Sequence, residues 1–268
     1  LMSVNIQFDG NQEFQTEAIS SVVDLFVDWA DGPAELGVSS NLVSDSDALL
    51  TESFFVNPWG IDDETLLENV KRVQSRLRID RDGQQKDIIP EDLRLDYENP
   101  GDLRDFAVEM ETGTGKTYVY LRTAIELFQN YKVGKFVIVV PSIAIREGVL
   151  SSLRLMKNHF QQLYPEVSYD SYVYDSKNLS RLRQFATSSN LQILIMNIQA
   201  FNTGDRIINT AGERGYKPIE FITSVRPVVI LDEPQKLDSK KAVKQREAIA
   251  SLNALFRLRY SATHLDRH

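Results

Sequence analysis

The sequence predicts an α/β fold in which a mostly parallel sheet is covered by helices on both faces. From residue 105 onward, short apolar runs rich in β-branched residues alternate with stretches of helical pattern. A glycine-bearing loop follows the first of these runs and leads directly into a helical stretch, as in strand–loop–helix units of α/β proteins. The 268-residue chain is 42% hydrophobic and has no apolar run of membrane-spanning length, so a globular protein is expected.

The first part of the chain, residues 1–104, predicts a decorated N-terminal extension packed on the main domain rather than a separate core. Apolar residues recur every three or four positions over Phe14–Trp29, which predicts an amphipathic helix. Residues 31–60 are rich in Gly, Ser, Asn, Asp and Pro without a sustained period, which favours loops. A second helix is expected over Asp62–Leu77, because acidic residues crowd its first turn.

Residues 105–268 predict one domain of alternating strands and helices. The expected strands are Phe106–Met110, Phe136–Val140, Tyr169–Tyr174, Ile193–Met196, Val228–Leu231 and Arg257–Ser261. The expected helices are Lys116–Asn130, Gly148–Leu163, Leu179–Ala186 and Lys240–Phe256. Loop signals dominate Phe201–Pro218.

Charge is distributed unevenly between the two parts. Residues 1–100 contain 21 acidic and 7 basic residues, whereas residues 101–268 contain 17 acidic and 23 basic residues. The basic surplus would suit a polyanion such as nucleic acid, and a well-solvated acidic face explains the first part equally well. The absence of cysteine excludes a disulfide scaffold and a cysteine nucleophile, and favours a cytoplasmic protein.

A phosphate-binding loop is predicted at residues 110–117, Met-Glu-Thr-Gly-Thr-Gly-Lys-Thr, which fits the Walker A pattern except that Met110 occupies the first glycine position. Glycines let backbone amides close around phosphate oxygens because they carry no Cβ. Lys116 would reach the β- and γ-phosphates of ATP, and the Thr117 hydroxyl would bind Mg²⁺. A plain Gly-Thr turn before a helix is the alternative. The residues expected to bind the nucleotide here are Thr112, Gly113, Thr114, Gly115, Lys116 and Thr117.

Two adjacent carboxylates, Asp232 and Glu233, end the apolar run Val228–Leu231. In a parallel sheet the carboxyl ends of the strands line the ligand crevice. Asp232 would share the Mg²⁺ ion with Thr117, and Glu233 would orient and deprotonate the attacking water. An Asp-Glu pair alone is more often a surface turn, but a phosphate loop in the same sheet favours a metal site. We therefore expect Lys116, Asp232 and Glu233 to be catalytic.

These motifs, in this order, resemble those of superfamily 2 helicases and translocases. The sequence more narrowly resembles the Res subunit of type III restriction enzymes, through METGTGKTYVY at 110–120, FVIVVPSIAIREGV at 136–149, ILIMNIQAFN at 193–202, VVILDEPQKL at 228–237 and YSATH at 260–264. The resemblance covers nearly the whole chain. It implies that residues 105–268 form the first RecA-like P-loop NTPase domain of a DNA-dependent ATPase, which in the full-length protein takes part in ATP-dependent DNA cleavage.

The resemblance also implies roles for residues outside the two loops. Gln15 matches a glutamine that reads adenine, for which an amide offers both a donor and an acceptor; a solvent-facing residue at a helix start is the alternative. Residues Pro141, Ser142 and Arg146 match a motif that contacts the nucleic-acid backbone, and a Pro-Ser turn that caps the next helix is compatible with this role.

Two further pairs are assigned by the same resemblance. Asn197 and Gln199 would add hydrogen bonds to the nucleic-acid backbone, or would be satisfied loop amides. Ser261 and Thr263 match the Ser-Ala-Thr motif, which links the nucleotide site to nucleic-acid movement.

The implied partners are double-stranded DNA and a modification (methyltransferase) subunit, with no membrane. The sequence stops after the Ser-Ala-Thr motif, so we expect the second RecA-like domain, its arginine finger and the nuclease domain to be missing and hydrolysis to be weak. A nucleotide-dependent binding or sensing module that does not move DNA is the alternative function. An unrelated P-loop kinase or transporter ATPase would not explain the segments at 141–148 and 261–263.

Overall fold

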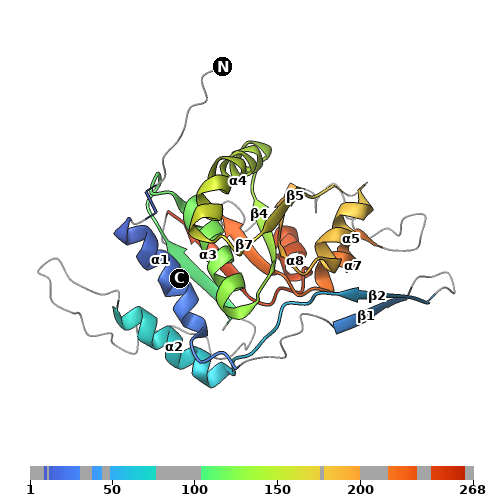
Figure 1. Cartoon of the computed structure of the whole chain (residues 1–268), viewed down its shortest axis with the longest axis horizontal. Coiled ribbons are helices and arrows are strands. Elements are labelled where there is room, and N and C mark those ends of the chain that lie inside the picture. Colours follow the sequence, from blue (N-terminus) through green and yellow to red (C-terminus); the bar gives the residue numbers. More distant parts are fainter. Residues whose placement is uncertain are drawn as a thin grey trace, which may run out of the picture.

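The six apolar runs between residues 105 and 261 form one parallel sheet in a computed structural model of the chain. The structure describes residues 9–10, 12–30, 38–43, 49–76, 104–175, 178–199, 217–233 and 243–262. The strands are β3 (Asp105–Glu109), β4 (Lys135–Val140), β5 (Tyr169–Val173), β6 (Leu191–Asn197), β7 (Val228–Asp232) and β8 (Arg257–Ser261). They lie in the order β3-β8-β7-β4-β6-β5, and every neighbouring pair is parallel. Figure 1 labels β4, β5 and β7 of this sheet. The predicted parallel α/β sheet is therefore confirmed.

The central strands β4, β6 and β7 are buried along their whole length. Strands of a parallel sheet that are buried on both faces read as continuous apolar runs, which is why the sequence predicted them well. Successive side chains point to opposite faces, so Phe136 and Ile138 join one hydrophobic cluster while Val137 and Val139 join the other.

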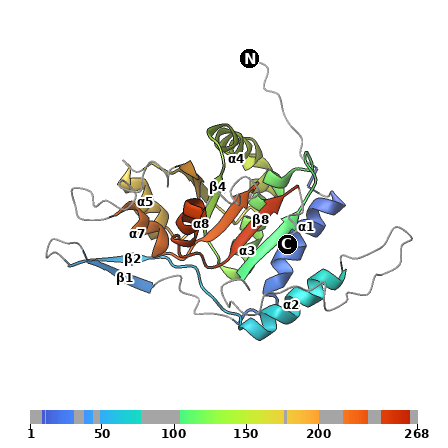
Figure 2. The ribbon, with the colours of Figure 1, turned by 180° about the vertical axis from the view of Figure 1, so that it is seen from behind.

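Helices cover the two faces of the sheet. Residues of α1 (Glu13–Val23), α2 (Asp63–Arg76), α3 (Lys116–Tyr131) and α4 (Ile143–Leu163) belong to the first cluster. Residues of α5 (Leu179–Thr187), α7 (Pro218–Thr223) and α8 (Val243–Ala250) belong to the second. Figure 2 shows this arrangement from behind, with β3 and β8 toward the viewer. Among the described residues, no helix combines the length and the apolar character that crossing a bilayer requires.

Several element boundaries differ from the predictions. Helix α1 ends at Val23 and continues as a short 3₁₀ helix, Asp24–Phe26, so it does not reach Trp29. Helix α4 begins at Ile143 rather than Gly148, because Ser142 caps it. Helix α8 ends at Ala250 rather than Phe256, because the chain turns at Asn253, whose φ of 53° is not helical.

Regular structure also occurs where loops were expected. Strands β1 (Val38–Val43) and β2 (Leu49–Phe54) pair antiparallel within residues 31–60. Helix α7 begins at Pro218, at the end of the segment with loop signals, and residues 201–216 of that segment lie outside the described residues. The first of these expectations was wrong because the strands are defined by backbone pairing, not by a periodic side-chain pattern.

The N-terminal segments are tied to the sheet by polar contacts as well as by the core. The side chain of Asn57 donates to the carbonyls of Lys135 and Arg226 and accepts from the backbone N–H groups of Gly134 and Lys135. Asn57 is buried, so these four bonds fix the segment after β2 at the start of β4. The hydroxyl of Tyr131 on α3 donates to the Val23 carbonyl at 3.0 Å, and this bond joins the end of α1 to α3.

Candidate functional site

The glycine-bearing loop connects β3 to α3 at one edge of the sheet. Gly113 and Gly115 have φ angles of 84° and 86°, in the left-handed region that side chains disfavour. The Thr114 hydroxyl donates to the Glu111 carbonyl at 2.7 Å and closes the turn. Met110 is buried in the core, and its N–H donates to the Ser261 carbonyl at 2.9 Å, so the departure from glycine at this position leaves the loop shape intact.

Gln15 of α1 holds this loop from the other side. Its Nε2 atom donates to the Thr114 carbonyl at 2.8 Å, and the residue is only 8% exposed. A Cβ at Gly115 would lie 2.6 Å from Gln15 Nε2, which could shift away, so it is the left-handed φ of 86° that favours glycine there. The solvent-facing alternative for Gln15 is therefore wrong, whereas its role in reading adenine stays a prediction.

The acidic pair ends β7 at the same edge of the sheet. Asp232 is buried, and Glu233 adopts a φ of 56°, an uncommon conformation for a residue with a side chain. The Glu233 N–H donates to the Tyr260 carbonyl at 3.1 Å, which fixes this turn on β8. Glu233 Oε1 accepts a hydrogen bond of 2.6 Å from Lys116 Nζ, so the first residue of α3 and the end of β7 form an ion pair.

One open cavity of about 800 Å³ brings the predicted residues together. The predicted residues that line it are Gln15, Thr112, Gly113, Gly115, Lys116, Thr117, Asp232 and Glu233. It is also lined by residues that the sequence did not single out, namely Asp9, Gln12, Tyr118, Ile145, Ser152 and Met156. The cavity lies at the carboxyl ends of parallel strands, where ligands bind in open α/β sheets.

A cluster of polar side chains on α3 and α4 holds the chain segment before α1, whose residues Asp9 and Gln12 line the cavity. The Arg122 guanidinium donates to the Gly10 carbonyl at 2.6 Å and to the Tyr164 hydroxyl at 2.8 Å. The Tyr118 hydroxyl lies 3.0 Å from His159 Nε2 on α4. Burial, with a smaller contribution from the Arg122 charge, lowers the pKa of His159. The spacing of Tyr118 and Arg122 by four on one helix was the available sequence signal for this cluster.

The residues around Thr117 and Asp232 fit a magnesium ion. Their side chains offer a hydroxyl and a carboxylate oxygen, the type of ligand that Mg²⁺ prefers, and both line the cavity. Beneath them lies Tyr120, which is 0% exposed. Its hydroxyl has no hydrogen-bond partner among the described residues, a costly arrangement in a protein interior. Burial, followed by the Asp232 charge, raises the pKa of Tyr120 well above its ordinary range.

The other predicted contacts also follow strand ends but lie outside the cavity. Ser142 accepts a hydrogen bond from the Ile145 N–H at 3.3 Å, so the predicted cap is confirmed. Pro141 precedes it at the end of β4. Arg146 pairs with Glu147 at 2.8 Å on α4. Their contact with nucleic acid stays a prediction.

The Asn197 Oδ1 atom accepts a hydrogen bond from the Gln199 N–H at 2.9 Å. Asn197 is buried and Gln199 is exposed. The Asn197 oxygen thus has a local partner, and contact of Asn197 and Gln199 with nucleic acid stays a prediction. Ser261 ends β8, and Thr263 lies outside the described residues.

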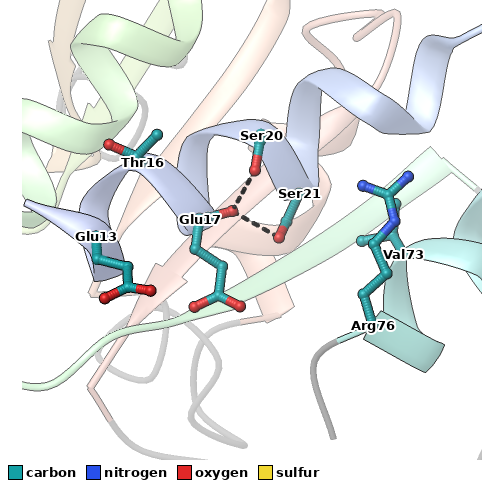
Figure 3. A pocket seen from close by; sticks show the side chains of 7 residues that line it. All are labelled: Glu13, Thr16, Glu17, Ser20, Ser21, Val73 and Arg76. Atoms are coloured by element: carbon teal, nitrogen blue, oxygen red, sulfur yellow. Dashed lines mark hydrogen bonds between the residues drawn. The ribbon is translucent and has the colours of Figure 1, made fainter. Parts of the chain in front are cut away.

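A second hollow, of about 520 Å³, lies between α1 and α2 (Figure 3). Ser20 and Ser21 line it, but their hydroxyls donate to the Glu17 carbonyl of their own helix at 3.0 and 2.7 Å. The Glu13 and Glu17 side chains are exposed. No residue predicted from the sequence to act in a site lines this hollow.

A parallel sheet with a glycine-bearing loop between β3 and α3 and an acidic pair after β7 defines an α/β protein of the P-loop class. The family model described as type III restriction enzyme, res subunit, matches residues 66–266, and the chain belongs to this family.

Curated relatives extend this match. The chain is 29% identical over 283 residues to the type III restriction-modification enzyme EcoPI Res subunit of Escherichia phage P1, covering 98% of this chain and 26% of that protein. It is 32% identical over 197 residues to the StyLTI Res subunit of Salmonella typhimurium, covering 63% of this chain and 20% of that protein. The chain thus spans about a quarter or less of the length of these relatives. A solved structure of Mss116p bound to ssRNA and AMP-PNP overlaps 61% of this chain and 32% of its own, with 19% identity and a TM-score of 0.43.

Proposed function

We propose that this chain is the ATP-binding first motor domain of a DNA translocase, which in the full-length Res subunit serves ATP-dependent DNA cleavage. One observation carries the proposal: residues distant in sequence converge on a single cavity, where Lys116 Nζ lies 2.6 Å from Glu233 Oε1. Membership of the res subunit family supports it. The division at residue 104 into an extension and a motor domain is part of the proposal.

ATP would bind with its phosphates against the loop at residues 112–117. The left-handed conformations of Gly113 and Gly115 give the loop its curvature, and the start of α3 adds the positive end of a helix dipole. The phosphates would compete with Glu233 for the Lys116 ammonium. Gln15 lies against the same loop, where its amide would meet the adenine base.

Thr117 and Asp232 would hold Mg²⁺, which when bound neutralises charge on the phosphate oxygens. Glu233, once its partner Lys116 is engaged by phosphate, would orient and deprotonate the attacking water. The pairing in this structure keeps the ammonium and the carboxylate within 2.6 Å of each other, which supports a role for both groups at the phosphates.

Duplex DNA would contact the carboxyl ends of β4 and β6 through Pro141, Ser142, Arg146, Asn197 and Gln199. These contacts would be to the DNA backbone and would not distinguish one base sequence from another. The DNA sequence would therefore be recognised by a partner, a methyltransferase subunit. Ser261 and Thr263 would couple the two sites. The hydrogen bond from Met110 N–H to the Ser261 carbonyl supports this coupling, because it joins the end of β8 to the start of the phosphate loop.

Isothermal titration of ATP with Mg²⁺ into this chain tests the nucleotide site. We expect Lys116→Ala to abolish binding and Lys157→Ala, at an exposed position of α4, to leave it unchanged. Equal binding by the wild type and Lys116→Ala would refute the site. ATPase assays of the full-length subunit with and without duplex DNA then separate a motor from a sensing module, since only a motor is stimulated by DNA.

A further inference from the structure

Tyr120 lies on α3, three residues after Thr117, on the helix face that packs against the sheet. Residues three and four apart share one helix face, so Tyr120 lies beneath both Lys116 and Thr117. Its ring packs edge-on against that of Tyr260, with the ring centroids 5.5 Å apart. Tyr260 belongs to β8, which separates β3 from β7 in the sheet. The Tyr120 side chain therefore reaches from the phosphate loop toward the acidic pair.

The two packed tyrosines differ in how their hydroxyls are satisfied. The Tyr260 hydroxyl donates to Thr123 Oγ1 at 3.4 Å, and Thr123 in turn donates to the Val119 carbonyl at 2.8 Å. The Tyr120 hydroxyl has no hydrogen-bond partner within the described ranges, although the residue is fully buried. A buried unpaired hydroxyl is destabilising, so its retention needs a reason.

The polar side chains that surround the Tyr120 hydroxyl suggest that reason. Tyr260, on which the Tyr120 ring packs, is the register partner of Asp232, and Thr117 lies one helical turn before Tyr120, so the two proposed ligands of the divalent cation flank this side chain. A phenol hydroxyl is protonated at neutral pH, so it has a proton to donate toward a carboxylate.

We propose that Tyr120 is a positioning residue of the divalent-cation site and donates a hydrogen bond to the Asp232 carboxylate when the cation is bound. The inference rests on the proposed function, because it presupposes that Thr117 and Asp232 bind Mg²⁺ with the nucleotide. Mg²⁺ tolerates little departure from octahedral geometry, so a hydrogen bond that orients its carboxylate ligand strengthens binding. Tyr120 does not touch the nucleotide in this arrangement and acts only through Asp232.

Tyr120→Phe removes the hydroxyl and keeps the packed ring, and Tyr260→Phe is the matched control. We would measure ADP affinity by titration calorimetry over a series of Mg²⁺ concentrations and in excess chelator. We expect Tyr120→Phe to need about 10-fold more Mg²⁺ for the same gain in affinity, and to bind ADP normally in chelator. Tyr260→Phe should match the wild type in both. In thermal unfolding without Mg²⁺, Tyr120→Phe should be at least as stable as the wild type, because it loses an unpaired polar group.

Three outcomes would overturn the inference alone. A Tyr120→Phe protein with the Mg²⁺ dependence of the wild type would show that the hydroxyl does not act on the cation site. An equal loss of ADP affinity with and without Mg²⁺ would show a purely structural role, and an equal shift in both variants would show a packing effect. If the wild type binds no nucleotide under any condition, the proposed function fails together with the inference.

Discussion

Lys116 and Glu233 are separated by 117 positions in the sequence, yet their side chains form a 2.6 Å ion pair at the edge of the sheet. Their side chains are 11% and 20% exposed, so the pair is largely shielded from water. The ion pair joins the glycine-bearing loop to the acidic pair after β7, two motifs that were predicted separately from the sequence. In the proposed function, a bound phosphate would therefore compete with Glu233 for the Lys116 ammonium, and the attacking water would compete with Lys116 for the Glu233 carboxylate.

Glu233→Gln removes the carboxylate that competes with phosphate for the Lys116 ammonium. We expect ATP affinity to stay equal or to rise, while turnover of the full-length subunit falls by about 100-fold or more because the general base is lost. Calorimetry on this chain and ATPase assays on the full-length subunit check the two parts. Weaker ATP binding by this variant would contradict the competition between Glu233 and phosphate.

Gly115→Ala places a Cβ 2.6 Å from Gln15 Nε2, at a residue whose φ is 86°. We expect a loss of about 1–3 kcal/mol in unfolding free energy and loss of ATP binding, because a residue with a side chain is strained at this φ and the Gln15 amide must shift. Denaturant unfolding and calorimetry measure these effects.

Gly148→Ala is the control for this change. Gly148 lies in α4, and nothing lies within 4 Å of the position that its Cβ would take. A helical Gly-to-Ala change should stabilise by about 0.5–1 kcal/mol. Equal effects of the two substitutions would contradict the steric argument at Gly115.

Lys135 gives stability a pH dependence. Its ammonium donates to the carbonyls of Phe185 and Ser188, but burial lowers its pKa to about 7. Between pH 7 and the ordinary lysine pKa the unfolded chain binds more protons than the folded one, so stability rises with pH. This lysine contributes at most about 1.4 kcal/mol per pH unit.

Urea unfolding at pH 7, 8 and 9 checks this rise, with Lys135→Met as the comparison. The difference in unfolding free energy between wild type and variant should change in favour of the wild type as pH increases. His159 has a lowered pKa and titrates below this window, and the buried tyrosines have raised pKa values and titrate above it. Parallel pH profiles for the two proteins would refute the shift at Lys135.

Asn57→Ala removes four hydrogen bonds to buried backbone groups at the start of β4 and before β7. Because those groups cannot reach water, we expect a loss of about 2–4 kcal/mol in unfolding free energy. Asn190→Ala, at an exposed position, should change it by less than about 0.5 kcal/mol. A loss below 1 kcal/mol at Asn57 would show that water replaces its bonds.

The sequence predicted the strands and the glycine-bearing loop, but not the contacts between residues that are distant in the sequence. The strands were predictable because β4, β6 and β7 are buried on both faces and read as apolar runs. The turn between β3 and α3 was predictable because Gly113 and Gly115 stand at the spacing of a phosphate-binding loop, and both adopt positive φ angles. The contact of Gln15 with Thr114 joins positions 99 apart, and only the tertiary packing of α1 brings them together.

Other features left no distinct pattern in the sequence. The β1–β2 hairpin depends on backbone pairing, which is not visible in the side-chain periodicity of residues 31–60. Tyr120 is a large aromatic residue on a buried helix face, so it could not be distinguished from an ordinary core residue until its unpaired hydroxyl was located. Local pattern therefore predicts elements and loops, whereas pairings between distant residues depend on the packed fold.

The position of β8 determines when the proposed nucleotide site can form. Strands β3 and β7 carry the two halves of the site, but β8 lies between them and is the last of the six to leave the ribosome. A nascent chain in which Arg257–Ser261 has not yet been synthesised contains both halves of the proposed site but lacks the strand that lies between them. The proposed nucleotide site is therefore complete only after Arg257–Ser261 has joined the sheet between its two halves.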